Sequence, residues 1–128
     1  MDTIPITLFT ASILGLMFIW LSARVIGARV RNDVLIGDDQ NEVLWASRTH
    51  GNFTEYVPVF LIVLALVESA GGNRTVLWII AILFILARLS HVPGMGPDAN
   101  LKFRQAGIIG SFTAIGAVSV YGLYLALF

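Results

Sequence analysis

The chain has 128 residues, of which 57% are hydrophobic and 12% are charged, and its mean hydropathy is +0.84. A soluble domain carries about 25% charged residues, so this composition excludes an ordinary water-exposed surface. Eight Lys and Arg balance eight Asp and Glu, which gives no argument for a nucleic-acid partner, and the lack of cysteine excludes a catalytic thiol of the protein's own. The composition predicts a single membrane-embedded domain over residues 1–128.

Four stretches are long and apolar enough to be spanning helices, and we place them at about 3–30, 43–70, 74–91 and 100–127. The first is uncharged up to Ala23 with basic residues behind it, which fits a spanning helix better than a cleaved signal sequence. The polar run 31–42 contains the turn sequence Gly37-Asp38-Asp39 and predicts the first loop. The second stretch of about 28 residues would measure about 42 Å, so its first two turns should lie in the headgroup region.

The third and fourth stretches are separated by the sequence Pro93-Gly94-Met95-Gly96-Pro97. The charge-free part of the third covers only 13 residues, 75–87. It spans the membrane only if Arg88 is also inside the bundle, beside a partner or a watery cavity. Small residues at 107, 110, 111 and 114 favour close packing of the fourth helix. The fold class we predict is an all-α integral membrane protein with four helices in an up-down bundle.

The basic residues are distributed unevenly along this bundle. In up-down order, the first and third loops share one side, and seven of the eight basic residues lie there: Arg24, Arg29, Arg31, Arg48, Arg88, Lys102 and Arg104. Only Arg74 lies on the other side. By the positive-inside rule we expect the first and third loops to face the cytoplasm and both termini to face the opposite side.

A polar stripe runs along the second helix. Arg48, Asn52 and Glu55 are spaced i, i+4 and i+7, so they fall within roughly 60° of one another, with Tyr56 on the flank. One interpretation is a structural ion pair between Glu55 and an arginine. Ionisable groups inside a membrane more often mark a functional site, and we favour that interpretation.

A second basic group is expected at the same depth. Arg88 and His91 are i, i+3 neighbours, and Arg104 comes one turn into the fourth helix. Together with Arg48 these arginines form a cluster whose mutual repulsion is offset by anions, so an anionic ligand is expected there. We interpret Arg24, Arg31 and Lys102 as interface residues whose side chains reach the headgroups.

These motifs resemble a known family. The run RTHGNFTEYVP, residues 48–58, resembles the second-helix signature of the MAPEG family, the membrane-associated proteins of eicosanoid and glutathione metabolism. The segment from Arg88 to His91, followed by Arg104, resembles the family's third-helix end and fourth-helix start. The resemblance implies a homotrimer that binds glutathione at each subunit interface, near the cytoplasmic face.

The resemblance also implies roles for individual residues. Arg104 would stabilise the glutathione thiolate as the catalytic residue, and Glu55 would bind the glutathione ammonium group. The residues that would hold the tripeptide are Arg29, Arg48, Asn52, Glu55, Tyr56, Arg88 and His91. Where several members carry a tyrosine four residues after the position of His91, this chain has Met95, which has no hydroxyl to donate.

The implied function is a membrane-bound glutathione transferase or peroxidase acting on hydrophobic electrophiles or lipid hydroperoxides that enter from the membrane lipid. No metal is expected. Two alternatives stay open. One is a small proton-coupled multidrug exporter, in which Glu55 would be the proton-exchanging carboxylate. The other is a non-catalytic lipid-binding membrane scaffold.

Overall fold

Each apolar stretch folds as one uninterrupted helix, because a lipid-embedded backbone has to satisfy its polar groups internally. The computed structural model describes residues 3–128, and its elements are α1 (Pro5–Asn32), α2 (Asn41–Ser69), α3 (Arg74–His91), the 3₁₀ turn η1 (Val92–Gly94) and α4 (Leu101–Leu127). All four helices are long and apolar enough to cross a membrane. The prediction of an all-helical chain with four such helices is confirmed, and the helix bounds lie within two residues of the expected ones.

The helix ends follow local sequence signals. Pro5 begins α1, where its missing N–H has no helical partner in any case. The side chains of Asn73 and Asn100 cap α3 and α4, accepting hydrogen bonds from the backbone N–H of Val76 and Lys102 at 3.2 and 3.0 Å. Gly71, with φ of +84°, follows the end of α2 in a conformation that favours glycine.

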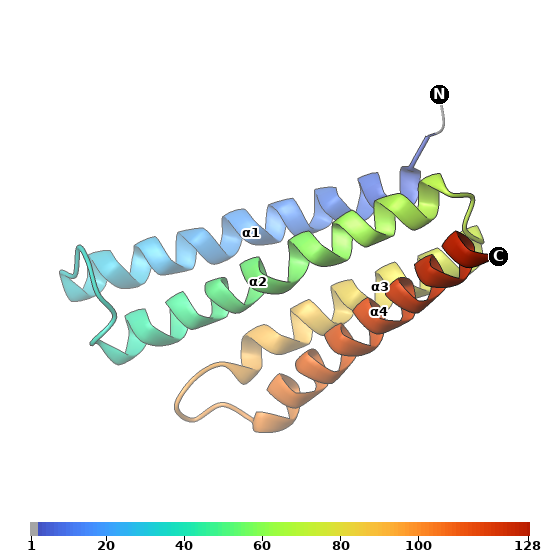
Figure 1. The fold of residues 1–128 in the computed structure, drawn as a ribbon. Helices are drawn as coiled ribbons and strands as arrows, with labels where there is room; N and C mark the ends of the chain where they lie inside the picture. Colours follow the sequence, from blue (N-terminus) through green and yellow to red (C-terminus); the bar gives the residue numbers. More distant parts are fainter. Residues whose placement is uncertain (1–2) are drawn as a thin grey trace.

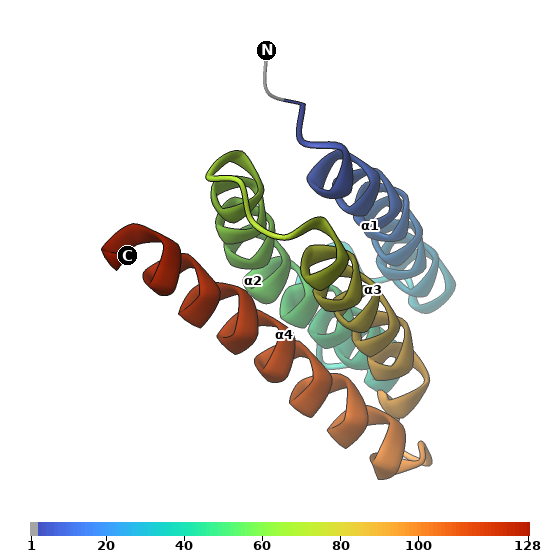
Figure 2. The same ribbon diagram turned by 90° about the vertical axis from the view of Figure 1, so that its right-hand side faces the viewer.

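The four helices run antiparallel to their chain neighbours (Figure 1). The loops 33–40 and 95–100 lie at one end of the bundle, which we call the loop end. The start of α1, the connection between α2 and α3, and the end of α4 lie at the other, which we call the terminus end. Figure 2 shows α2 and α3 between α1 and α4, and both outer helices pack against both inner ones.

The core lies between these helices and is mainly aliphatic and aromatic. The rings of Phe60 and Phe84 stack at a centroid distance of 3.8 Å where α2 meets α3. Of the most apolar 18 residues in each helix, 50% are buried in α3 but only 17% in α4. α3 is therefore the most buried of the four helices, and α4 presents most of its surface outward.

α4 approaches α3 closely because glycine faces it. A Cβ atom on Gly107 would lie 2.6 Å from the Cβ of His91, and one on Gly110 would lie 2.8 Å from the Cβ of Ala87. Such distances are too short for real side chains, so these positions need glycine. The small residues of the fourth helix thus serve packing inside the chain, and they bring the first turns of α4 against the end of α3.

Two polar side chains at the terminus end, those of Glu68 and Tyr121, accept hydrogen bonds from other parts of the chain. The carboxylate of Glu68 on α2 accepts hydrogen bonds from the N–H of Ile6 at 2.9 Å, and from the N–H and hydroxyl of Thr7 at 2.7 Å each. The hydroxyl of Tyr121 on α4 accepts one from the N–H of Asn73 at 2.7 Å. A carboxylate at the N-terminus of α1 also complements the helix dipole.

Candidate functional site

A cavity of about 320 Å³, here called the first cavity, lies at the loop end between α2, the end of α3 and α4. It is lined by Leu44, Trp45, Arg48, Asn52, His91, Met95, Arg104 and Ile108. The structure therefore brings together four of the residues singled out from sequence, which come from three different helices. No carboxylate is among the described residues that line it.

The α2 side of the first cavity follows from helical spacing. Trp45, Arg48 and Asn52 are separated by three and four residues, so they share one face of the helix. Arg48 is exposed and Asn52 is half-buried. Within residues 3–128, the Arg48 side chain makes no hydrogen bond or ion pair, and its guanidinium is left free for a ligand.

Arg88 lies behind the cavity wall. It is only 1% exposed, and its Nη1 donates to the side-chain oxygen of Asn52 at 2.8 Å while Nη2 donates to the carbonyl of Gly107 at 3.3 Å. Its guanidinium also lies 5.4 Å from the centre of the Tyr56 ring, a distance typical of a cation–π contact. The expectation that an arginine at this depth needs a partner inside the bundle is met by Asn52. The arginine cluster predicted from sequence is therefore smaller inside the cavity, because Arg48 and Arg104 line it whereas Arg88 reaches it only through its hydrogen bond to Asn52.

The α3 and α4 sides are held by close backbone contacts. His91 is 3% exposed and packs against Gly107. Gly94 lies so close to the backbone of Arg104 that a Cβ atom there would collide with its nitrogen. These two glycines fix the position of Arg104, at the start of α4, relative to His91, at the end of α3. Arg104 itself is half-buried and, within the described residues, has no acceptor for its guanidinium.

Glu55 and Tyr56 lie in a separate hollow farther along α2, here called the Glu55 hollow. This hollow measures about 450 Å³ and is lined by Glu55, Tyr56, Val59, Phe112, Ile115 and Gly116. Between residues 3 and 128, the one ion pair joins Arg31 to Glu42, so Glu55 does not pair with an arginine of its own chain. The structural ion-pair interpretation of the stripe is therefore wrong for a single chain, and Glu55 is exposed.

Arg29 lines neither the first cavity nor the Glu55 hollow. Its Nη1 donates to the carbonyl oxygens of Gly37 at 2.8 Å and Leu35 at 3.5 Å, and so it shapes the loop between α1 and α2. This differs from the sequence-based expectation, because the loop folds back over the end of α1. Within one chain, Arg29 is a loop-organising residue.

Several residues of the first cavity were not singled out from sequence. Trp45 lies one turn before Arg48, so extending the polar stripe backwards by three residues would have found it. Met95 has no hydroxyl to donate, but it forms part of the lining. Leu44 and Ile108 carry no signal that separates them from other apolar positions.

The model of the MAPEG family matches residues 7–124, nearly the whole chain. The chain belongs to the MAPEG family. The resemblance predicted from the second-helix motif is thereby confirmed, and the apolar helices are those of a multi-pass integral membrane protein.

The chain is similar to the inner membrane protein YecN of Escherichia coli strain K12. The two are 26% identical over 102 residues, which cover 79% of this chain and 77% of YecN. YecN of Escherichia coli O6:H1 strain CFT073 matches with the same identity and coverage. No solved structure matches this MAPEG chain.

Proposed function

We propose that this MAPEG protein is a membrane-bound glutathione transferase, with peroxidase activity on lipid hydroperoxides, that works as a homotrimer. The observation that carries the proposal is the first cavity. It combines the guanidiniums of Arg48 and Arg104 with Asn52 and His91, and no carboxylate of the described chain lines it. A cavity with two unpaired cations is suited to an anionic ligand.

Glutathione fits this charge pattern. It carries two carboxylates and one ammonium group, so it needs more cationic than anionic partners. Arg48 would bind a carboxylate, and Glu55, exposed in the neighbouring hollow with Tyr56, would bind the ammonium group. Asn52 would be oriented by its hydrogen bond from Arg88. The volume of about 320 Å³ is within the usual range of roughly 300–1,000 Å³ for small-ligand sites.

A homotrimer would complete the site. The first cavity and the Glu55 hollow both border α4, the helix with the smallest buried fraction. A neighbouring subunit would therefore find free surface beside them. Arg29 is held at the loop of its own chain, and we assign it to the glutathione site across a subunit boundary. Hydrophobic substrates would enter from the lipid along the same exposed surface.

The catalytic role we assign to Arg104 is electrostatic. A free thiol has a pKa of about 8.5, so only a few per cent is thiolate at pH 7. A guanidinium close to the sulfur favours the charged form, and a depression of about two pKa units corresponds to about 2.7 kcal/mol. The glutathione thiolate would then be the dominant species at neutral pH.

Two reactions follow from a stabilised thiolate. With an electrophile such as an aryl halide, the sulfur electron pair forms the S–C bond and the halide departs with the bonding pair. With a hydroperoxide, the sulfur attacks the terminal oxygen, the O–O bond breaks, and the alkoxide takes a proton to become an alcohol. The resulting sulfenic acid condenses with a second glutathione to give the disulfide and water.

The test of this function is the ultraviolet absorbance of the thiolate on titrating the purified protein with glutathione. Wild type should develop the absorbance at neutral pH, and Arg104→Ala should develop it only at a pH about two units higher, with conjugation at pH 7 reduced about 25-fold because the thiolate fraction falls from about three quarters to about 3%. Arg74→Ala, at the terminus end, is the matched control and should behave as wild type. Equal thiolate absorbance in Arg104→Ala and wild type would exclude this role for Arg104.

The two alternatives predict different results in the same preparations. A lipid-binding scaffold would show no glutathione binding in the purified oligomer. An exporter would drive proton-dependent efflux of cationic dyes that is lost in Glu55→Gln and kept in Arg104→Ala. Either result would overturn the proposal.

We also propose that the loop end faces the cytoplasm, because seven of the eight basic residues lie toward it. The chain has no cysteine, so single cysteines report sidedness without background. Leu35→Cys, at a position that is 93% exposed, should react with a membrane-impermeant thiol reagent only after the membrane is opened, and Phe128→Cys should react in intact cells. The reverse pattern would invert the orientation.

A further inference from the structure

A second cavity lies beside the first at the loop end, and the proposed function does not use it. It measures about 360 Å³ and lies between the end of α1, the start of α2 and residues 95–97. Its lining is formed by Arg24, Ala28, Arg31, Asn41, Glu42, Trp45, Ala46, Met95, Gly96 and Pro97. Trp45 and Met95 line both cavities, so these two side chains form the wall between them.

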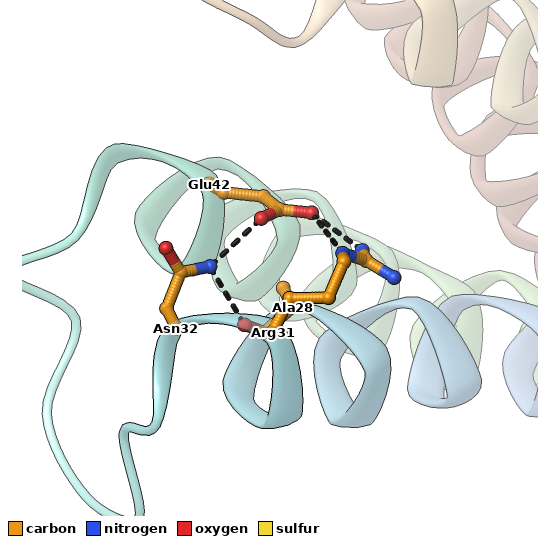
Figure 3. A network of polar contacts seen from close by, with 4 residues as sticks. All are labelled: Ala28, Arg31, Asn32 and Glu42. Atoms are coloured by element: carbon orange, nitrogen blue, oxygen red, sulfur yellow. Dashed lines mark hydrogen bonds and ion pairs between the residues drawn. The ribbon is translucent and has the colours of Figure 1, made fainter.

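Glu42, the acidic residue of the second cavity, has its partners within the chain. Glu42 accepts hydrogen bonds from Arg31 Nε at 2.8 Å on one oxygen and from Asn32 Nδ2 at 2.7 Å on the other (Figure 3). Asn32 Nδ2 also donates to the carbonyl of Ala28 at 2.8 Å, which ties this network to the last turns of α1. Arg31 and Glu42 therefore balance each other's charge, and the carboxylate is not engaged with Arg24.

Arg24 is the remaining charge of the second cavity. Its Nη1 is buried, and no atom of residues 3–128 accepts a hydrogen bond from it. The guanidinium lies 5.5 Å from the ring centre of Trp20, which stabilises a cation but offers no acceptor oxygen. Nη1 is closed off from the cavity, but Arg24 lines the cavity with its remaining atoms and makes no hydrogen bond or ion pair within the described residues, so an anion bound in the cavity would supply the missing acceptor. Its volume is about ten times the roughly 30 Å³ that one water molecule occupies in the liquid.

The remaining lining determines what kind of anion fits. Trp45, Met95 and Pro97 give the cavity apolar walls, so its occupant combines an anionic oxygen group with carbon. Trp20 is half exposed on the outer side of α1, one turn before Arg24. Tryptophan at that position is typical of the headgroup layer, where phosphate groups are abundant.

We propose that the second cavity binds the phosphate group of a membrane phospholipid, with Arg24 as its main contact. The glycerol and upper acyl carbons would lie against the apolar walls. This site is separate from the proposed glutathione site, because the two cavities have different arginines and share only Trp45 and Met95. The proposal therefore stands or falls independently of the glutathione chemistry.

Native mass spectrometry of the detergent-purified protein tests this site. The probes are phosphatidylglycerol, phosphatidylcholine and inorganic phosphate, each added separately to delipidated protein. Wild type should retain phosphatidylglycerol, and more weakly phosphatidylcholine, whose choline cation opposes Arg24. Arg24→Gln should bind phosphatidylglycerol roughly tenfold more weakly, the loss expected for one charge-assisted hydrogen bond. Arg24→Lys, which keeps the charge but not the fork of donors, should fall between them.

Arg74→Gln is the control, because it removes an exposed arginine at the start of α3, which lies at the terminus end, and should leave lipid binding unchanged. Competition by inorganic phosphate would support recognition of the phosphate itself, and retention without such competition would support recognition of the whole lipid. Equal affinity in wild type, Arg24→Gln and Arg24→Lys would overturn the proposal. Displacement of phosphatidylglycerol by glutathione would also overturn it, because that result would place the lipid in the first cavity.

Discussion

The two ends of the bundle differ in how some of their polar side chains are satisfied. At the terminus end, the carboxylate of Glu68 accepts hydrogen bonds from Ile6 and Thr7, and the Tyr121 hydroxyl accepts one from Asn73. At the loop end, the described chain supplies no acceptor to the Arg48 side chain, and none to Nη1 of Arg24. A polar group that is satisfied within the chain serves folding, whereas one left unsatisfied beside a cavity is available for a ligand.

The largest effect is expected where a satisfied network is broken. Glu68→Ala removes the acceptor for three donors at the start of α1, and the free energy of unfolding should fall by about 3 kcal/mol, because charge-assisted hydrogen bonds are worth roughly 1.5–3 kcal/mol each and are not additive. Unfolding in mixed micelles measures this change. Glu68→Gln keeps one acceptor oxygen and should lose less. An unfolding midpoint for Glu68→Ala equal to that of wild type would show that the cap does not stabilise α1.

The loop end should instead respond in activity. In Gly94→Ala the new methyl group collides with the backbone of Arg104, and the displaced guanidinium should lower the conjugation rate by roughly tenfold to a hundredfold, since shifts of about 1 Å have such effects. Gly96→Ala is the matched control, because its Cβ would meet only the Cβ of Ala99 at 3.6 Å, an ordinary contact. Steady-state rates of both variants decide this, and equal losses in the two would argue against a specific role for Gly94.

A smaller effect is expected for the free arginine of the first cavity. Arg48→Gln removes one charge-assisted contact to a glutathione carboxylate, and the dissociation constant should rise about tenfold, or about 1.4 kcal/mol. The thiolate pKa should not change, because we assign the sulfur to Arg104. Calorimetric titration with glutathione measures the affinity. If Arg48→Gln moved the thiolate pKa and not the affinity, the two arginines would have exchanged roles.

The smallest effect is expected for the pair of Arg31 and Glu42. Both side chains are well exposed, at 63% and 46%, and exposed ion pairs contribute little to stability. Arg31→Gln should therefore leave the unfolding midpoint within experimental error of wild type, as measured in the same micelles as Glu68→Ala. A loss as large as that of Glu68→Ala would remove the contrast between the two ends.

Sequence patterns were sufficient for the helices and for half of the first cavity. Long uncharged runs, capping Asn73 and Asn100, and the glycine after α2 define the elements, and the i, i+4 spacing places Arg48 with Asn52. Spacing did not separate Glu55 from Asn52, because one helical stripe can border two different hollows.

The surroundings of the arginines were not predictable in the same way. The position of Arg88 behind Asn52 depends on the carbonyl of Gly107, 19 residues further along the chain. The contacts of Arg29 depend on how the loop folds back, since its acceptors are backbone carbonyls and backbone carbonyls carry no sequence signal. Residue type predicts that a guanidinium seeks acceptors, and only the tertiary fold determines which acceptors it reaches.

The close approach of α4 to α3 has a consequence for how the gene can change. On the inner face of α4, side-chain size limits which residue types are tolerated, because positions 107 and 110 have no room even for a methyl group. On the outer face, where most of the helix surface lies, exchanges among Leu, Ile, Val and Phe keep the lipophilic character that a spanning helix needs. Among descendants of this chain, substitutions should accumulate on the outer face of α4, whereas the glycines of its inner face should be retained.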